Sequence, residues 1–318
     1  MRFSYEVFSQ ILDRHLQEEQ TERILEALAD SPQRFTGIFR PSTPREKLIQ
    51  YVVQSREIRF GDAFEEIIDT ILRESGYAPL SKTLKSEGSR KLACDLLFES
   101  PDGFSVLLVE QKMRDDHDSS KREGQFANFK LKIEAVRERY EDSNLHAVMY
   151  FVDPNQKKNQ SYYTDKCNGV AASLNQSPSR SMTLSILYGE EFFSYIATHL
   201  SPLCVDWVTL TEWLRQWRNT VRSDALELID LEKQENLYRV IEIASRRPEL
   251  ISKIARNHLL WAESLIKAVF PTGDGLRKIC ASLSVSSAKC KQAAYALEQS
   301  ISKFYDNQEG TDGERATS

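Results

Sequence analysis

The sequence predicts an α/β fold: a mixed sheet of four to five strands flanked by helices, with a helical N-terminal arm and an all-α C-terminal domain. Three observations support this prediction. Apolar residues recur at helical spacing as far as Gly76, segments with strand character then alternate with helices up to residue 200, and no convincing strand appears beyond residue 205. We therefore expect a helical N-terminal arm over residues 1–55, an α/β core over 56–204, a helical domain over 205–305 and a disordered tail over 306–318.

Helical periodicity is clear in two segments near the N-terminus. Residues 1–32 and 61–77 each place large apolar side chains three or four positions apart between charged faces. Prolines, a glycine and hydroxyl residues interrupt the pattern after residue 35, so that a new helix can start near Thr43. Gly76 is expected to cap the second helix at its C-terminal end. The apolar positions are Phe8, Ile11, Leu12, Leu16, Ile24, Leu25 and Leu28 in the first segment and Phe64, Ile67, Ile68, Ile71 and Leu72 in the second.

Residues 91–200 are predicted to form a sheet with intervening helices. Residues 91–99 alternate like a strand, residues 101–104 form a turn, and residues 105–112 are a more continuously apolar strand, so together they predict a hairpin. A polar loop over 113–125 leads into a helix over 126–142. Residues 145–154 and 183–189 supply two further strands, and a helix over 190–200 follows.

Composition narrows the class of protein. With 41% hydrophobic and 28% charged residues, the chain is expected to fold as an ordinary globular protein. A net charge of −5 lacks the overall basicity common in nucleic-acid-binding proteins, although phosphate binding needs only a local basic surface. Five cysteines without a CxxC pair argue against a zinc site. The chain shows neither a signal peptide nor an apolar run of about 18 residues, and we expect a cytoplasmic protein.

The predicted hairpin brings three charged residues together. Glu110 and Lys112 are two positions apart on one strand and therefore point to the same face, and the short turn folds Asp95 back beside them. Two carboxylates can hold Mg²⁺ next to a phosphate, because Mg²⁺ prefers hard oxygen ligands and keeps several waters. Lys112 can then orient a water or offset charge in the transition state of phosphodiester hydrolysis.

A solvated strand end is the simpler interpretation of a Glu-x-Lys pair, since most such pairs have no chemical role. Here the strand is apolar up to Glu110, and a charged group at the end of a buried strand requires a partner. This context favours a functional site.

The order D-x14-E-x-K, read here as CDLLFESPDGFSVLLVEQK, resembles the PD-(D/E)XK nuclease superfamily. Asp95, Glu110 and Lys112 match its motif, whereas Cys94 stands where the proline would be. The helix GDAFEEIIDTIL is similar to the G-x-x-F-E opening of many members, whose glutamate reaches the metal cluster. This match implies that Glu65 is a third metal-binding and catalytic residue, and Glu66 is the alternative.

Within the superfamily, the segment EQKMRDDHDSSKREGQFANF looks most like the type II restriction endonucleases, with the subfamily left open. The resemblance covers residues 55–200 in architecture and implies a restriction-endonuclease-like fold. It further implies a Mg²⁺-dependent, site-specific endodeoxyribonuclease that cuts double-stranded DNA. A homodimer is expected because two strands need two active sites, and a cognate DNA methyltransferase is implied as the functional partner.

The loop after Lys112 has two candidate roles. Its acidic cluster, Asp115 to Asp118 with His117, is interpreted as a solvated loop in preference to a metal site. The loop adjoins the predicted active site and can lie against DNA. In that position Arg114, Lys121 and Arg122 would meet phosphates and Gln125 would lie near the cleft.

A second DNA-binding element is suggested near the C-terminus. Residues 276–300 place small or apolar residues at a spacing that resembles a helix-turn-helix, with Ser284 at the turn. The second helix would present Ser287, Lys289, Lys291 and Gln292 to the major groove. An ordinary helical hairpin packed on the protein body explains the same spacing equally well.

Two other functions agree with parts of this pattern. The chain could be another nuclease of the same superfamily, acting in repair, in transposition or as a phage-defence effector, with the same site residues. It could also be a non-catalytic DNA-binding regulator whose C-terminal helices carry the function. Incubation with DNA and Mg²⁺ separates these possibilities.

Overall fold

The computed structural model describes residues 3–18, 20–37, 39–85, 91–174, 181–221, 225–257 and 262–306. The chain forms two compact units, the first from residues 1–12 and 61–220 and the second from residues 13–60 and 221–318. These divisions differ from the expected ones, because most of the N-terminal arm groups with the C-terminal helices and residues 205–220 group with the α/β core. Residues 307–318 of the expected tail lie outside the described residues.

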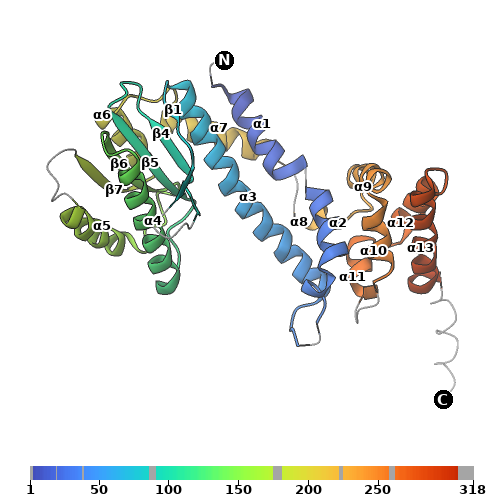
Figure 1. Ribbon diagram of the computed structural model, residues 1–318. Coiled ribbons are helices and arrows are strands. Elements are labelled where there is room, and N and C mark those ends of the chain that lie inside the picture. Colours follow the sequence, from blue (N-terminus) through green and yellow to red (C-terminus); the bar gives the residue numbers. More distant parts are fainter. Residues whose placement is uncertain are drawn as a thin grey trace. The chain divides into compact units, whose positions relative to one another are not determined.

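The first unit contains a five-stranded mixed sheet in the order β1-β4-β5-β6-β7 (Figure 1). β4 pairs with β1 and β5 in antiparallel fashion, whereas β5, β6 and β7 are parallel. The predicted α/β fold and strand number are therefore confirmed. The strands are β1 Ala78–Pro79, β4 Leu96–Glu99, β5 Ser105–Lys112, β6 Asn144–Phe151 and β7 Met182–Tyr188, and β2 Thr83–Lys85 pairs with β3 Lys91–Ala93 in a separate two-stranded sheet.

Helices cover both faces of the large sheet. Phe129 and Ile133 of α4 (Ser119–Arg139) and Tyr163 of α5 (Gln160–Leu174) belong to one core cluster with the side chains of β5 and β6 that face them. On the other face, Phe192 of α6 (Glu190–His199) stacks on Tyr150 of β6. The remaining helices that contribute to this unit are α1 Tyr5–Asp13, the C-terminal half of α3 Pro44–Glu74, and α7 Trp207–Thr220.

Three details of the first unit differ from the expectation. Helix α3 is continuous from Pro44 to Glu74, so the two expected helices are one. Helix α5, which we did not expect from the sequence, supplies the crossover that two parallel strands such as β6 and β7 require. Asp95 lies in a break between β3 and β4, not in the middle of a strand.

The second unit is entirely helical among its described residues. Ile24, Leu25 and Leu28 of α2 share a core with Val240 of α9 and Ile251 of α10, which explains why the N-terminal segment groups with the C-terminal one. The elements are a π-helical turn Arg14–Glu18, α2 Gln20–Asp30, a 3-10 turn Pro32–Arg34, the N-terminal half of α3, α8 Ala225–Ile229, α9 Gln234–Arg246, α10 Pro248–Ala255, α11 Ala262–Val269, α12 Asp274–Ser284 and α13 Ala288–Phe304. In neither unit does a described helix combine the length and apolar character needed to cross a membrane.

Gly189, between β7 and α6, is a position where alanine should destabilise the first unit. Its φ of 51° favours glycine, and an added Cβ would lie 2.8 Å from Pro154 Cβ and 3.2 Å from the Trp207 ring. We expect Gly189→Ala to lower the free energy of unfolding by about 2 to 4 kcal/mol through backbone strain and overpacking. Chemical denaturation followed by circular dichroism measures the change.

Gly103 provides the matched control. Its φ is 73°, but an added Cβ meets nothing within 4 Å, so Gly103→Ala tests backbone strain alone and should cost about 1 kcal/mol. Equal costs at the two positions would show that the contacts with Pro154 and Trp207 are unimportant.

Candidate active site

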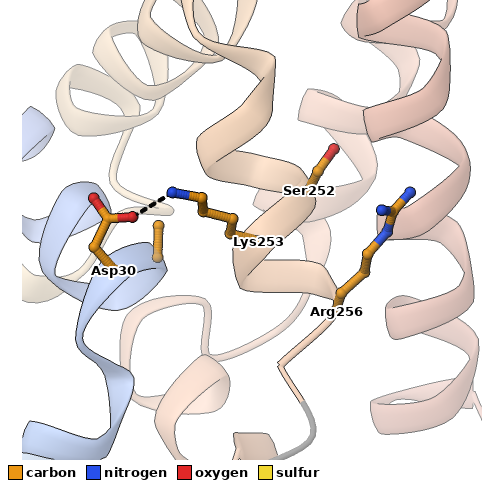
Figure 2. Close-up of a pocket in the computed structure, with 5 residues that line it drawn as sticks. Asp30, Ser252, Lys253 and Arg256 are labelled. Carbon is orange, nitrogen blue, oxygen red and sulfur yellow. Dashed lines mark hydrogen bonds and ion pairs between the residues drawn. The ribbon is translucent and has the colours of Figure 1, made fainter.

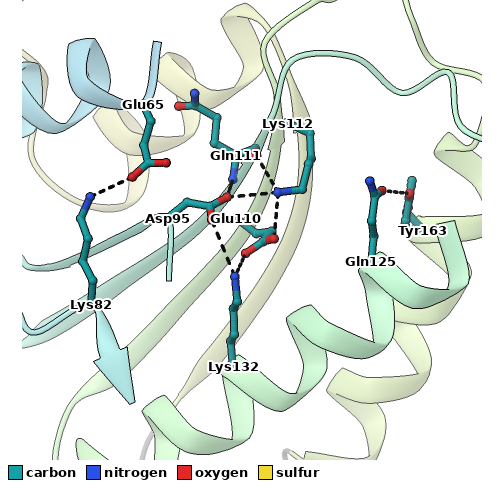
Figure 3. A network of polar contacts seen from close by, with 9 residues as sticks. All are labelled: Glu65, Lys82, Asp95, Glu110, Gln111, Lys112, Gln125, Lys132 and Tyr163. Atoms are coloured by element: carbon teal, nitrogen blue, oxygen red, sulfur yellow. Dashed lines mark hydrogen bonds and ion pairs between the residues drawn. The ribbon is translucent and has the colours of Figure 1, made fainter. Parts of the chain in front are cut away.

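Asp95, Glu110 and Lys112 meet at the C-terminal end of β5 (Figure 3). The β4–β5 register pairs Leu96 with Val109, so Asp95 arrives next to Glu110. Lys112 Nζ lies 3.1 Å from Asp95 Oδ2 and 2.9 Å from Glu110 Oε1. The structure therefore brings together the three residues that the sequence singled out.

The backbone of Gln111 fixes this arrangement. Its N–H donates to Asp95 Oδ2 at 2.8 Å. This hydrogen bond holds the Asp95 carboxylate just before the first residue of β4 that pairs with β5. The carbonyl oxygen of Gln111 accepts from Lys112 Nζ at 2.8 Å. The Lys112 ammonium is thus surrounded by three oxygen atoms, one each from Asp95, Glu110 and Gln111.

A second lysine, which the sequence analysis missed, enters the site from α4. Lys132 Nζ lies 2.5 Å from Glu110 Oε2 and 3.7 Å from Asp95 Oδ1 (Figure 3). The residue is buried in line with Phe129 and Val136 on the apolar face of α4. The sequence contains a signal for a buried ion pair at Lys132, because a lysine on the apolar face of a helix requires a buried partner.

The charges of the site stabilise one another. Burial lowers the pKa of Lys112, but the neighbouring carboxylates of Glu110 and Asp95 outweigh this effect and hold the pKa above its usual range. Lys112 is therefore a stable cation at neutral pH. A charged lysine suits it to contact with a phosphate.

Glu65 lies on α3 at the edge of the same site (Figure 3). Its Oε1 pairs with Lys82 Nζ at 3.0 Å, and Lys82 also lies 3.4 Å from Asp69 Oδ1. Burial raises the pKa of Glu65, Lys82 opposes the rise, and the charge of Asp95 adds to it. Among the described residues, no three His, Cys, Asp or Glu side chains form a group that could hold a metal ion. The role of Glu65 as a metal ligand stays a prediction.

The acidic loop after β5 is only partly solvated, which corrects the expectation for Asp115. Asp115 is completely buried and accepts hydrogen bonds from the backbone N–H of Asn159 at 2.7 Å, from Asn159 Nδ2 at 2.8 Å and from Tyr188 Oη at 3.0 Å. Asp116 is exposed, and Asp118 caps α4 by accepting from the N–H of Lys121 at 2.9 Å. Asp115 therefore anchors the loop that follows Lys112.

The candidate phosphate-binding residues lie on this loop and on the first turns of α4. Arg114 and Lys121 are exposed. Arg122 donates to Asn159 Oδ1 at 2.9 Å and lies 4.3 Å from the centre of the Tyr162 ring. Gln125 accepts from Tyr163 Oη at 3.0 Å (Figure 3).

The expected helix-turn-helix segment corresponds to α12 and α13. Cys290 and Ala293 of α13 are buried, whereas the four residues predicted to face outward are exposed. Ser287 also caps α13 by accepting from the N–H of Cys290. The exposed residues are Ser287, Lys289, Lys291 and Gln292. Both a DNA-reading helix and an ordinary helical hairpin have this geometry.

The helical unit contains a separate pocket of about 500 Å³, lined by Ala29, Asp30, Ser252, Lys253 and Arg256 (Figure 2). Asp30 Oδ1 pairs with Lys253 Nζ at 2.5 Å, and the Arg256 side chain points away from this pair. A single carboxylate offers no equivalent of the two carboxylates of Asp95 and Glu110. We therefore place the candidate active site at the end of β5.

Residues 79–201 match the family model described as Type II restriction endonuclease, HinfI. The matched segment runs from the end of β1 to just past α6 and includes Asp95, Glu110, Lys112 and Lys132. It confirms the resemblance to type II restriction endonucleases, and the HinfI family is the one to which this segment is similar. Glu65 and the exposed residues of α13 lie outside it. No curated protein matches the chain.

Proposed function

We propose that the type II restriction endonuclease segment of this chain hydrolyses phosphodiester bonds of double-stranded DNA at a short specific site, with Mg²⁺ as cofactor. The observation that carries the proposal is the set of three oxygens around Lys112 Nζ, contributed by Asp95, Glu110 and the Gln111 carbonyl at 2.8–3.1 Å. Oxygens that converge on one ammonium group can converge equally on a metal cation.

The donor set fits Mg²⁺. Two carboxylates and a backbone carbonyl are hard oxygen ligands, and this number leaves positions for water and for a phosphate oxygen. Asp95, Glu110 and Gln111 would hold the ion, and Glu65 would join them from α3 once released from Lys82. When bound, Mg²⁺ polarises the phosphodiester and lowers the pKa of its water.

The protein side chains supply the remaining chemistry. Lys112 keeps its proton, and its ammonium group can move from the carboxylates to a phosphate oxygen or to the attacking water. In either position it offsets the negative charge that accumulates in the transition state. Asp95, fixed by the N–H of Gln111, keeps its carboxylate in place during this exchange.

DNA contacts outside the reaction centre are also part of the proposal. One group of residues lies on the loop after β5 and on the first turns of α4, and it is suited to contact the phosphates next to the cut bond. The group consists of Arg114, Lys121, Arg122 and Gln125. Ser287, Lys289, Lys291 and Gln292 would read bases if α13 enters a groove. A homodimer would cut both strands of a palindromic site, and a cognate methyltransferase would protect host DNA in the cytoplasm.

The test is incubation of the purified protein with unmethylated plasmid or phage DNA and Mg²⁺, with EDTA as the control. Discrete fragments that require Mg²⁺ are expected. A smear would indicate a nonspecific nuclease, and intact DNA that is nevertheless bound would overturn catalysis and favour a DNA-binding regulator.

A further inference from the structure

Lys132 places a second ammonium group against both candidate metal-binding carboxylates. Lys112 contacts Asp95 Oδ2 and Glu110 Oε1, whereas Lys132 lies by the opposite oxygens, Asp95 Oδ1 and Glu110 Oε2. Two carboxylates and two ammonium groups therefore form a closed, electrically neutral cluster. A divalent cation that enters this cluster must displace positive charge or add to it.

The two lysines differ in how freely their ammonium groups can move away from the carboxylates. The Lys112 side chain is 24% exposed, and it can swing out toward solvent or a phosphate. The Lys132 side chain is 4% exposed, and its helix packs on the sheet through Phe129 and Ile133. Moving the Lys132 ammonium away from Glu110 would separate this buried cation from its closest carboxylate, so Lys132 stays.

The charge count changes when a cation replaces Lys112. Two carboxylates, one divalent cation and the fixed ammonium of Lys132 leave the centre with an excess of one positive charge. Such an excess is unfavourable in a partly desolvated site unless an anion is near. The phosphate of bound DNA is the anion that the proposed reaction brings to this position.

We propose that Lys132 is a positioning residue that fixes Glu110 and makes divalent-cation binding at the site dependent on DNA phosphate. The inference rests on the proposed function in one respect: it takes Asp95 and Glu110 as the ligands of the cation. It assigns Lys132 no contact with the reacting atoms. Without DNA the cluster keeps cations weakly bound, and with DNA the phosphate compensates the charge of Lys132.

The test removes the Lys132 charge and measures Ca²⁺ binding to the full-length, DNA-free protein by calorimetry. Ca²⁺ uses the same hard oxygen ligands as Mg²⁺. Lys132→Met should bind Ca²⁺ at least about tenfold more tightly than the wild-type protein, because a repulsive charge next to both carboxylates is gone. Lys132→Arg keeps the charge and should stay close to wild type.

Lys130→Ala is the matched control, because Lys130 lies on the same helix but is exposed and paired with Glu134. It should leave Ca²⁺ affinity unchanged. A gain in affinity cannot come from damage to the fold, so the expected result separates positioning from mere structural support. The proposal is overturned if folded Lys132→Met binds Ca²⁺ no more tightly than wild type.

The wild-type protein provides a second measurement that needs no variant to fold. A short DNA duplex should raise its Ca²⁺ affinity at least about tenfold, and the same duplex should have a smaller effect on Lys132→Met. Equal wild-type affinity with and without duplex would also overturn the proposal. If wild-type protein cuts DNA with Mg²⁺ while these expectations fail, only the role of Lys132 is wrong, and the proposed function stands.

Discussion

Replacement of Lys112 with alanine should lower the rate of DNA cleavage roughly 100- to 1,000-fold, the usual cost of losing a group that stabilises transition-state charge. Binding of duplex DNA should change little, because phosphate contacts are spread over many residues. The measurements are single-turnover cleavage at saturating Mg²⁺ and a binding assay in Ca²⁺. Normal cleavage by Lys112→Ala would show that the site assignment is wrong.

Two comparisons test whether the loss of cleavage in Lys112→Ala has a cause other than the missing ammonium group. Lys82 is also a lysine paired with a site carboxylate, but it contacts Glu65 and Asp69 at the edge of the site. Lys82→Ala should therefore reduce cleavage less than about tenfold. Calcium affinity should not fall in Lys112→Ala, because its ammonium competes with the cation for the same oxygens. Weaker binding of Ca²⁺ would mean that Lys112 supports the carboxylates and not the reaction.

The convergence of Asp95, Glu110 and Lys112 was predictable because it depends on local geometry. Strand alternation places Glu110 and Lys112 on one face, and a short turn limits where Asp95 can lie. The catalytic role of the three residues stays a prediction. The position of Asp95 in a strand break was not predictable, since it depends on a side-chain hydrogen bond to the N–H of Gln111.

Lys132 illustrates a different limit of prediction from the sequence. It is 20 positions from Lys112 in the chain and reaches the site only because α4 packs across β5, and no local spacing encodes that contact. The pattern within α4 nevertheless contains the signal, a lysine surrounded by apolar positions. In the same way, α5 follows from two consecutive parallel strands, although its own residues show weak amphipathic character.

The boundaries of the two units depend on contacts between distant segments. Residues 1–32 were correctly predicted to be helical, but nothing within them indicates that α2 joins a core with α9 and α10. The ion pairs of Arg247 with Glu22 and Glu26 connect residues more than 200 positions apart. Sequence patterns define which face of a helix is buried and leave its partner open.

Asp115 is where loss of one carboxylate should affect stability most. Replacement by alanine removes the acceptor of three hydrogen bonds in a buried position, which come from the backbone N–H of Asn159, from one N–H of Asn159 Nδ2 and from the hydroxyl of Tyr188. The other N–H of Nδ2 keeps its bond to the His117 carbonyl at 3.1 Å. At about 1 kcal/mol or more for each unsatisfied group, Asp115→Ala should lower the free energy of unfolding by about 3 kcal/mol or more. Chemical denaturation of the full-length protein measures the loss.

The same substitution should also reduce DNA binding, because Asn159 connects Asp115 to Arg122 through its side-chain oxygen. Asp115→Asn retains one acceptor oxygen, so it should lower both the free energy of unfolding and the affinity for DNA less than Asp115→Ala does. Asp116→Ala is the control, since Asp116 is exposed and should change stability by about 0.5 kcal/mol or less. If Asp115→Ala and Asp116→Ala prove equally stable, the buried carboxylate does not anchor the loop, and the placement of Arg122 must have another cause.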